Sequence, residues 1–475
     1  MVLHIIPIEG RLVTADRYSY LAYFGLFVMA ASFIQKHILQ NQKLKSLFPV
    51  LFMGFLFLFS VSTYSRTLVW KNTLTLFEDV LKKSPDIPFA YLNVGGTYLN
   101  NRLPANALIY FNRSINLDSL DPSAYFNRAL AFYMSGKSDS AICDFNKVIQ
   151  LSKAKSDIAL VYTNMGEIYH KTGKDSLALK YYKKSLETDS SIAASYNNIG
   201  MYYFQERNLS KASDCFKKAI ELDPDYADAW NNRGWVMSIQ GNVNDAMKCF
   251  DRSLLLNPGY AMALNNRGYL KFKNKDIKGS LDDYNQALKI DSSLTEAYLN
   301  RGWIYSSTGN FQSAVSDYSY VLNKIKNHQT ALTNRAFAWF YMKDFKKAAK
   351  DFEGAVKYFP DVAVSHQNLG WFKLQMKEYD SAVNEFNEAV KLDSTLTNSY
   401  LNLGWLWLEK GNKLKAEENL NEVLKLSPQN GEAFFLLGEL FRKNHNLGIA
   451  CKNYSEAQKY GNKQAQKALT DYCKN

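Results

Sequence analysis

Residues 227–258 read ADAWNNRGWVMSIQGNVNDAMKCFDRSLLLNP, and this stretch decides the fold because it recurs along the chain. Residues 261–292 repeat it as AMALNNRGYLKFKNKDIKGSLDDYNQALKIDS, and residues 295–324 as TEAYLNRGWIYSSTGNFQSAVSDYSYVLNK. Each copy begins 34 residues after the previous one. A fixed period of this size is typical of a stacked array, in which each unit buries its apolar face against its neighbours.

Eleven copies align from residue 88 onward, over residues 88–460. They start at residues 88, 122, 159, 193, 227, 261, 295, 329, 363, 397 and 431. The interval from 122 to 159 is longer, and we place its extra residues in a loop over 151–158. In nearly every copy a small residue at position 20 and an aromatic residue at position 24 allow close helix packing. The sequence predicts an all-α solenoid of about eleven helix pairs, right-handed, with a junction helix in residues 66–87 and a capping helix in 461–475.

The bulk composition supports a folded helical chain and argues against nucleic-acid binding. Only 10 of 475 residues are Pro, and aromatic residues make up 14%. The net charge is +12, but no run of five or more Lys or Arg concentrates it. The six histidines are scattered without metal-ligand spacing, and no phosphate-binding loop occurs. We therefore expect no metal, no cofactor and no nucleic-acid partner.

The five cysteines form no C-x-x-C pair, and they leave the redox compartment open. They are Cys143, Cys215, Cys249, Cys451 and Cys473. The first four fall on second helices of separate repeats, where packed helices lie about 8–10 Å apart. A disulfide needs a Cα separation under about 7 Å. The spacing therefore predicts buried free thiols.

Two apolar runs precede the array. Residues 18–34 (YSYLAYFGLFVMAASFI) and 47–64 (LFPVLFMGFLFLFSVSTY) carry no charge, and each is close to the ~20 residues that cross a bilayer. They predict two transmembrane helices, at about 18–35 and 47–64, after a short N-terminal segment of residues 1–17. The alternative is a signal peptide followed by a buried helix, but no basic segment precedes the first run.

The basic residues around these runs predict a topology. Three lysines lie in the loop of residues 35–46, against two basic residues before the first run and two just after the second. The positive-inside rule then places the loop in the cytoplasm and the array outside it. The sequence thus predicts a multi-pass membrane protein with two spans, in which residues 18–65 contact lipid.

The array resembles the tetratricopeptide repeat over residues 88–460. Position 7, normally a core Leu in that family, is Arg in five repeats, and in four of these Asp stands at position 23 on the facing helix. We predict structural pairs within repeats: Arg128 with Asp144, Arg267 with Asp283, Arg301 with Asp317, and Arg335 with Asp351. Coincidence, or arginines that extend to solvent, is the alternative. Arg233 faces Cys249 instead.

Asparagine at position 6 is more regular still. The resemblance implies that first helices line the inner face of a superhelix, where such amides bond the backbone of an extended peptide. A carboxamide both donates and accepts, so this role is chemically sound. The candidate peptide-binding residues are Asn127, Asn164, Asn198, Asn232, Asn266, Asn300, Asn334, Asn368 and Asn402. The alternative is that these amides bond within their own repeat.

The N-terminal end carries a second resemblance. The run TADRYSYL of residues 14–21, with Gly25, is similar to the segment before the last membrane helices of TMTC-type O-mannosyltransferases, which have the GT-C fold. Arg66, Trp70, Lys71 and Leu76 match their junction to a repeat array, whereas Ala22 stands where that family usually has Pro. Nothing here corresponds to the catalytic half of those enzymes, so we expect no activity from this chain alone.

Two functions follow from the sequence. The first is a membrane-anchored scaffold whose concave face binds an extended polypeptide or a partner protein. The second is the acceptor-binding C-terminal portion of a membrane glycosyltransferase whose catalytic half is truncated or separately encoded. A soluble scaffold is a third possibility if the apolar runs are misinterpreted. The sequence leaves the partner's identity and the oligomeric state open.

Overall fold

The computed structural model describes residues 28–29, 31–38 and 42–473, and within them every regular element is a helix. The chain divides into two compact units, residues 1–195 and residues 196–475. The described residues form 25 α-helices and one π-helix, about 13 pairs if all are counted. Eleven pairs form the array, and the remaining helices lie before and after it.

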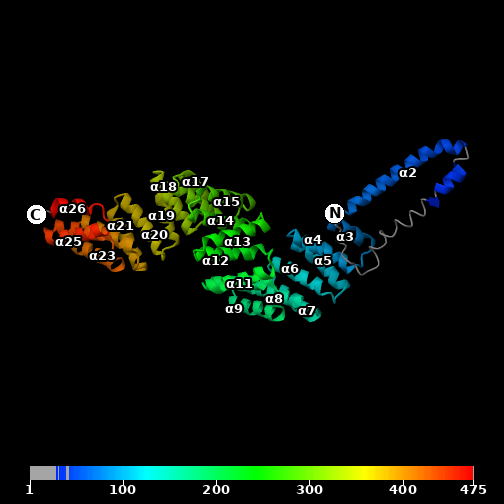
Figure 1. Cartoon of the computed structure of the whole chain (residues 1–475), viewed down its shortest axis with the longest axis horizontal. Coiled ribbons are helices and arrows are strands. Elements are labelled where there is room, and N and C mark those ends of the chain that lie inside the picture. Colours follow the sequence, from blue (N-terminus) through cyan, green and yellow to red (C-terminus); the bar gives the residue numbers. More distant parts are fainter. Residues whose placement is uncertain (1–27, 30, 39–41, 474–475) are drawn as a thin grey trace. The chain divides into compact units, whose positions relative to one another are not determined.

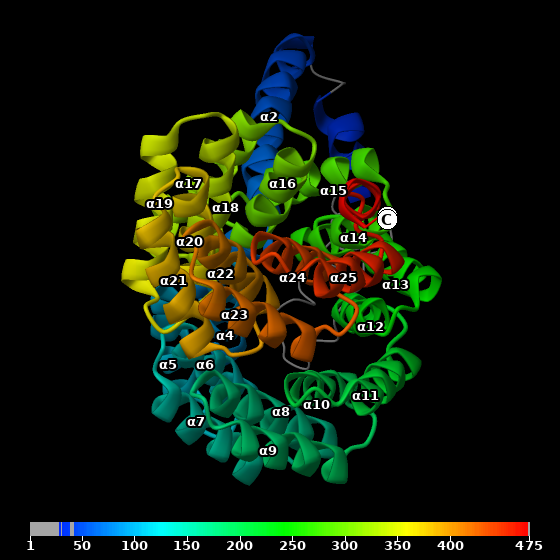
Figure 2. The same cartoon turned by 90° about the vertical axis from the view of Figure 1, so that its left-hand side faces the viewer.

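Successive helices of the array pack as antiparallel pairs, each a first and a second helix of 13 to 17 residues (Figure 1). The pairs are α4 (Pro88–Asn100) with α5 (Pro104–Leu117), α6 (Pro122–Met134) with α7 (Ser138–Leu151), α8 (Lys155–Lys171) with α9 (Asp175–Thr188), α10 (Ala193–Gln205) with α11 (Leu209–Leu222), α12 (Ala227–Ile239) with α13 (Val243–Leu256), α14 (Ala261–Lys273) with α15 (Ile277–Ile290), α16 (Thr295–Ser307) with α17 (Phe311–Lys324), α18 (Gln329–Tyr341) with α19 (Phe345–Tyr358), α20 (Ala363–Gln375) with α21 (Tyr379–Leu392), α22 (Thr397–Glu409) with α23 (Lys413–Leu426), and α24 (Gly431–Lys443) with α25 (Leu447–Lys459). Figure 2 shows α12 to α15 stacked in this order within the second unit. The all-α solenoid expected from the period is confirmed.

The helices before the array do not support the predicted membrane hairpin. The π-helix η1 (Ile34–Ile38) is followed by α2 (Gln42–Val69) and α3 (Thr73–Lys83). None of the described helices combines the length and the apolar character needed to cross a bilayer. Most of the predicted first span lies outside the described residues. The second span falls within α2.

This finding contradicts the prediction of two membrane spans. The predicted membrane location, the extracytoplasmic array and the lipid contact through residues 18–65 were derived from those spans, so they lose their support as well. The prediction rested on runs without charge. That criterion gives no weight to the Ser, Thr and Gly residues inside the second run, nor to the Lys and Arg residues that the same helix carries at both ends.

The junction helix that we expected within residues 66–87 corresponds to α3, which covers only residues 73–83. Helix α2 continues to Val69, a turn follows, and α3 begins after Asn72, whose side chain accepts from the Thr75 N–H at 2.9 Å. This reciprocal cap starts a new helix within a few residues. Phe77 on α3 packs edge-to-face on Phe89 of the first repeat, with ring centroids 5.8 Å apart.

The longer interval in the array extends a helix where we expected a longer loop. Helix α8 begins at Lys155, so only residues 152–154 connect it to α7. Each residue added to an existing helix gains one backbone hydrogen bond, here with the Ile158 N–H donating to the Ala154 carbonyl. Asp157 lies in the first turn, where a negative charge favours the helix dipole.

Each repeat turns between its two helices through one residue with a left-handed backbone. This residue is position 15, and all eleven have φ between 57° and 82°. Five are Gly, and the others are Arg102, Arg207, Lys275, Lys343, Lys377 and His445. A left-handed residue ends the first helix and satisfies its last carbonyls. A basic side chain there also interacts favourably with the carbonyl end of the helix dipole.

The core of each repeat lies between the small residues and the ring at position 24. Phe145, Phe250 and Tyr318 are fully buried in this way. A Cβ added to Gly302 would lie 2.8 Å from the Tyr318 ring. Helix α16 can therefore approach α17 closely only because position 8 lacks a side chain.

The C-terminal end contains a disulfide that the sequence analysis did not predict. Cys451 on α25 is bonded to Cys473, which caps α26 (Ala465–Tyr472), and their Cα atoms are 5.7 Å apart. The prediction of free cysteines is wrong for this pair because α26 folds back onto α25, whereas only neighbouring repeats were considered. Of the free cysteines, Cys249 is buried, Cys215 is half-buried and Cys143 is exposed.

Candidate functional site

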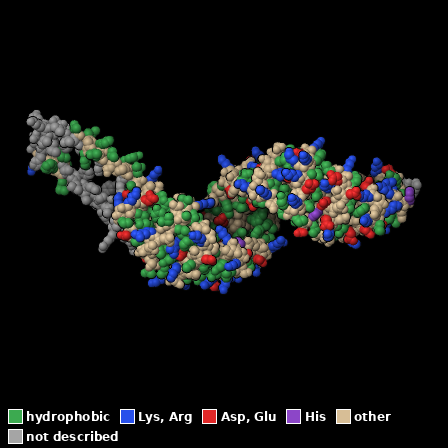
Figure 3. Space-filling view, turned by 180° about the vertical axis from the view of Figure 1, so that it is seen from behind, with side chains coloured by type: hydrophobic (Ala, Val, Ile, Leu, Met, Phe, Trp, Pro, Cys, Tyr) green, Lys and Arg blue, Asp and Glu red, His purple; other side chains and the backbone are tan. Residues whose placement is uncertain are grey.

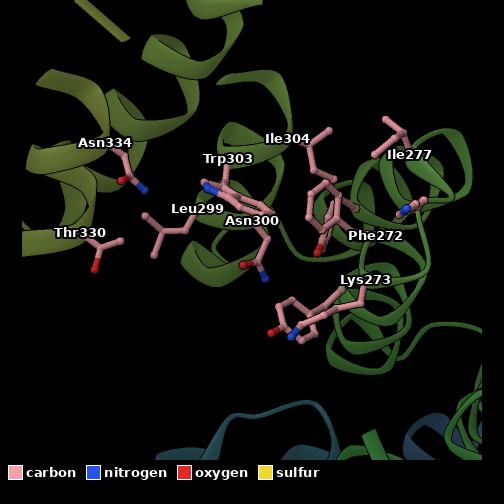
Figure 4. A pocket seen from close by; sticks show the side chains of 12 residues that line it. Phe272, Lys273, Ile277, Leu299, Asn300, Trp303, Ile304, Thr330 and Asn334 are labelled. Carbon is pink, nitrogen blue, oxygen red and sulfur yellow. The ribbon is translucent and has the colours of Figure 1, made fainter. Parts of the chain in front are cut away.

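The first helices of three successive repeats enclose a pocket in the second unit. It has a volume of about 810 Å³, and its lining comes mainly from α14, α16 and α18 (Figure 4). The lining residues are Tyr269, Phe272, Lys273, Lys275, Ile277, Tyr284, Leu299, Asn300, Trp303, Ile304, Thr330 and Asn334. On the face shown in Figure 3, hydrophobic side chains lie among Lys, Arg, Asp and Glu side chains along the array.

The lining of this pocket includes an exposed tryptophan. Trp303 is 49% exposed, and its indole meets the Phe272 ring edge-to-face at a centroid distance of 4.4 Å. The Lys273 ammonium lies 5.7 Å from the centre of the Tyr269 ring. Large rings with one face open are well suited to bind a partner's side chain, since they bury much area at little cost in conformational entropy.

Two of the candidate asparagines, Asn300 and Asn334, line the same pocket from successive first helices (Figure 4). Asn334 lies within hydrogen-bonding reach of Tyr318, whose pKa is raised to about 12 by burial. Asn300 donates its amide N–H to the Asn265 side-chain oxygen at 3.0 Å. The pocket therefore combines an apolar floor with carboxamides that can bond a peptide backbone.

The asparagines of the preceding repeats form a continuous ladder of hydrogen bonds. Between repeats, position 6 donates to position 5 of the previous repeat, each at 3.0 Å: Asn300 to Asn265, Asn266 to Asn231, and Asn232 to Asn197. Within each helix, position 5 donates to position 6, at 3.3 Å for Asn265 to Asn266, 3.2 Å for Asn231 to Asn232 and 3.5 Å for Asn197 to Asn198. The ladder begins at Asn300 because Leu299 occupies position 5 of that repeat.

The ladder explains which candidates are least accessible to a ligand. Asn266 is only 9% exposed, and its amide is bonded to both neighbours. Asn127, Asn164 and Asn402 instead donate to the carbonyl four residues earlier in their own helices, at 2.8, 2.8 and 2.9 Å. Asn368 is half-buried on α20. The fold itself thus uses at least one amide N–H of most predicted contacts.

The structure brings the two residues of each of the four predicted Arg–Asp pairs together. In each pair Nε and Nη2 donate to the two carboxylate oxygens over 2.7–2.9 Å. The pairs are Arg128 with Asp144, Arg267 with Asp283, Arg301 with Asp317, and Arg335 with Asp351. This two-point geometry fixes the angle between the helices of one repeat.

Each of these arginines also reaches the preceding repeat. Nη1 donates over 2.7–3.0 Å to position 25 of the previous second helix, which is Asn112, Asp251, Asn285 or Ser319. The bond to Asp317 raises the pKa of Arg301, while burial opposes this effect. Burial raises the pKa of Asp317, while the bonds from Arg301 act in the opposite direction. One guanidinium thus connects three helices.

Arg233 in repeat five lacks this arrangement. Its Nε atom is buried and, among the described residues, has no hydrogen-bond partner. Position 23 is Cys249, 4% exposed, and burial raises the pKa of its thiol. Position 25 of the preceding repeat is Lys217, a second cation. Both acceptors of the other four sites are therefore missing.

The sequence contains signals for the ladder and for the third acceptor of the arginines. Asn-Asn pairs at positions 5 and 6 recur in repeats four, five and six, and they mark the ladder. Asn, Asp and Ser at position 25 mark the third acceptor of the arginines. Nothing in the 34-residue period marks the pocket, since its lining comes from three repeats.

The stacked helix pairs define a helical repeat solenoid protein, and comparisons with known families identify the repeat. Models of the tetratricopeptide repeat match residues 159–192, 193–226, 215–248, 240–294, 295–321, 363–396 and 397–430. The chain is a tetratricopeptide repeat protein, and proteins of this class generally bind protein partners.

Similarity to individual proteins is partial. The chain is 31% identical over 95 residues to a NADPH oxidase activator of Dictyostelium discoideum, which covers 20% of this chain and 15% of that protein. It is 34% identical over 101 residues to the human DnaJ homolog subfamily C member 3, covering 21% of this chain and 19% of that protein. The chain thus matches less than a fifth of the length of either relative.

Two solved structures align with much of the chain, each with a TM-score below 0.5. The Cut9–Hcn1 hetero-tetramer of the APC/C has a TM-score of 0.46 at 13% identity, covering 87% of this chain and 95% of that chain. Yeast Tom70 has a TM-score of 0.43 at 14% identity, covering 80% of this chain and 93% of that chain.

Proposed function

We propose that this protein is a scaffold that binds an extended polypeptide segment on the first helices α14, α16 and α18. The observation that carries the proposal is the pocket around Trp303, which joins an open indole to the carboxamides of Asn300 and Asn334. An apolar anchor beside groups that bond a backbone is the combination by which a groove holds an extended chain.

The ladder narrows the proposal to this pocket. Asn232 and Asn266 already bond the neighbouring repeats, so they contribute mainly to the stack. Asn300 also donates into the ladder through its amide nitrogen, but its side-chain oxygen receives no bond from position 5 of its own helix, because that residue is Leu299, and Asn300 lines the pocket. We therefore place the carboxamide contacts to the ligand at repeats seven and eight, and we assign the earlier asparagines a structural role.

The alternative function, an acceptor-binding portion of a glycosyltransferase, depended on a sequence resemblance at residues 14–25 and at the junction, and residues 14–25 lie outside the described residues. The family models match only the tetratricopeptide array, so they add no support for such an enzyme. The peptide-binding scaffold needs only the array, and it is the function that the geometry supports best.

The test is a selection of binders from a random displayed peptide library against the full chain. The strongest binder is then synthesised, and its Kd is measured by calorimetry against the wild type, W303A, N334A and N402A. Losing one hydrogen bond costs about 1 kcal/mol, so N334A should weaken binding about fivefold and W303A more. N402A is the matched control, since Asn402 bonds its own helix.

An absence of selectable peptides would refute the proposal, and so would binding that W303A and N334A leave unchanged. Circular dichroism of each variant separates loss of contact from loss of fold. Trp303 is about half exposed, so its replacement leaves no buried cavity.

A further inference from the structure

The rim of the pocket is positively charged. Lys273 ends α14, and Lys275 follows it in the turn; both side chains are exposed. Among the ion pairs of the described residues neither lysine takes part, whereas the Nζ of Lys271, on the same helix, lies 2.8 Å from Asp283. The twelve lining residues include no Asp or Glu. The pocket therefore presents two cations without an acidic group in its wall.

Apolar side chains line much of the pocket beside these lysines. Leu299 and Ile304 lie beside Trp303 on α16, and Phe272 and Ile277 border it from the neighbouring pair (Figure 4). A bulky apolar side chain laid on the indole would be desolvated there, and aromatic residues in such hollows provide most of the affinity of a peptide interface.

We infer that this pocket selects extended peptide segments in which an Asp or Glu side chain stands next to a bulky apolar residue. The inference rests on the proposed function and adds the chemistry of the ligand. The apolar residue lies on Trp303, and the carboxylate meets Lys273 or Lys275. The carboxamides of Asn300 and Asn334 bond the peptide backbone.

The position of the charges determines what they contribute. Exposed rim charges attract an oppositely charged ligand, and they speed association more than they hold the complex. Their effect is screened within about 8 Å at physiological ionic strength. The preference for acidic peptides should therefore weaken as salt is added, while the apolar contribution stays nearly constant.

The test uses the full chain and an array of short peptides with an acetylated N-terminus and an amidated C-terminus. A central Phe, Leu or Trp is flanked by Asp, Glu, Asn, Gln, Lys or Ser, and Kd is measured by fluorescence anisotropy at low and physiological salt. Peptides flanked by Asp or Glu should bind about tenfold more tightly than those flanked by Asn or Gln at low salt.

The variants K273E and K275E, singly and combined, should abolish or reverse this preference. K278E is the matched control, because Lys278 is exposed on α15 and does not line the pocket. Equal binding of acidic and amide peptides to the wild type would overturn the inference and leave the proposed function standing. If no peptide in the array binds and the library selection also fails, the proposed function fails with it. A preference that K278E reduces as much as K273E would assign the effect to net charge and overturn the inference.

Discussion

Repeats five and seven carry the same Arg-Gly-Trp run in their first helices, yet the two arginines have opposite surroundings. Arg301 in repeat seven bonds Asp317 through two nitrogens and Asn285 through the third. Arg233 in repeat five faces Cys249, and its Nε atom has no partner among the described residues. The difference shows that an arginine at position 7 does not connect the three helices by itself. The connection also needs the two acceptor residues, at position 23 of the same repeat and at position 25 of the preceding repeat.

The difference also indicates what the Arg–Asp pairs contribute to the fold. Removing two charges from water is costly, so a buried pair adds little net stability but strongly penalises a wrong arrangement. In repeats two, six, seven and eight the guanidinium joins three helices from two repeats, which fixes both the hairpin and its stacking. The interface between repeats four and five has no equivalent connection. The stability of an array is roughly the sum of repeat and interface terms, so this interface should open more readily than the next three.

The largest expected effect comes from removing an acceptor in repeat seven. D317A leaves Arg301 buried without its carboxylate, and should lower the free energy of unfolding by about 3 kcal/mol. Hydrogen exchange of peptides from α16 and α17, together with a urea titration, measures the loss. D282A is the control, since Asp282 is exposed beside the equivalent Asp of repeat six. A loss under about 0.5 kcal/mol would mean that the pair does not constrain the helices.

The reverse experiment supplies the missing acceptor in repeat five. C249D places a carboxylate opposite Arg233 and should raise the stability of α12 and α13 by about 1 kcal/mol, the net value of a typical intramolecular hydrogen bond, because burying the new carboxylate offsets part of the gain from a charged pair. The measurement is protection from hydrogen exchange in these two helices, with C249S as the control of similar size. Destabilisation by C249D beyond that of C249S would show that Arg233 cannot reach the new carboxylate.

A smaller loss should follow when only the third acceptor is removed. N285A deletes the group that accepts from Arg301 Nη1 at 2.7 Å, while both bonds to Asp317 remain. We expect a loss of about 1 kcal/mol or less, because this contact is exposed to water. A double-mutant cycle with R301L measures the coupling. If the two substitutions are additive, the inter-repeat bond contributes nothing.

The smallest effect is expected at the matching position before repeat five. The side chain of Lys217 is 60% exposed, and its Nζ atom lies 3.9 Å from Oε1 of Glu221. K217N would put an acceptor where Arg301 has Asn285, and should stabilise the interface by a few tenths of a kcal/mol. The combination K217N/C249D gives Arg233 in repeat five the same two acceptor residues that Arg301 has in repeat seven. It therefore tests most directly whether these acceptors account for the difference between the two repeats. A gain no larger than that of C249D alone would show that the third contact is not formed.

Much of the fold was predictable because each repeat carries the same short-range residue pattern, and that pattern recurs many times along the chain. The spacing of small and aromatic residues fixes which faces two consecutive helices bury, so the eleven pairs follow from the period. The Arg–Asp proposal used the same logic, and the structure places these side chains 2.7–2.9 Å apart. The extra residues after Leu151 were misplaced, because a helix and a loop of that length differ by only a few hydrogen bonds.

The remaining features depend on how one repeat is offset from the next. Asn266 bonds Asn231 and Arg301 bonds Asn285 across that offset, and the period alone does not specify it. The disulfide of Cys451 and Cys473 depends on the last helix folding back, which no repeat position encodes.

The sequence by itself determined the helix pairs, their turns and the residues that each pair buries, since these depend on spacings within 34 residues. Only the tertiary structure decided the asparagine ladder, the third acceptor of the arginines and the pocket around Trp303. The physical reason is that each of these features joins side chains from different repeats. The distances between those side chains depend on the rotation of one repeat relative to the next, and the spacing along the chain does not specify that rotation.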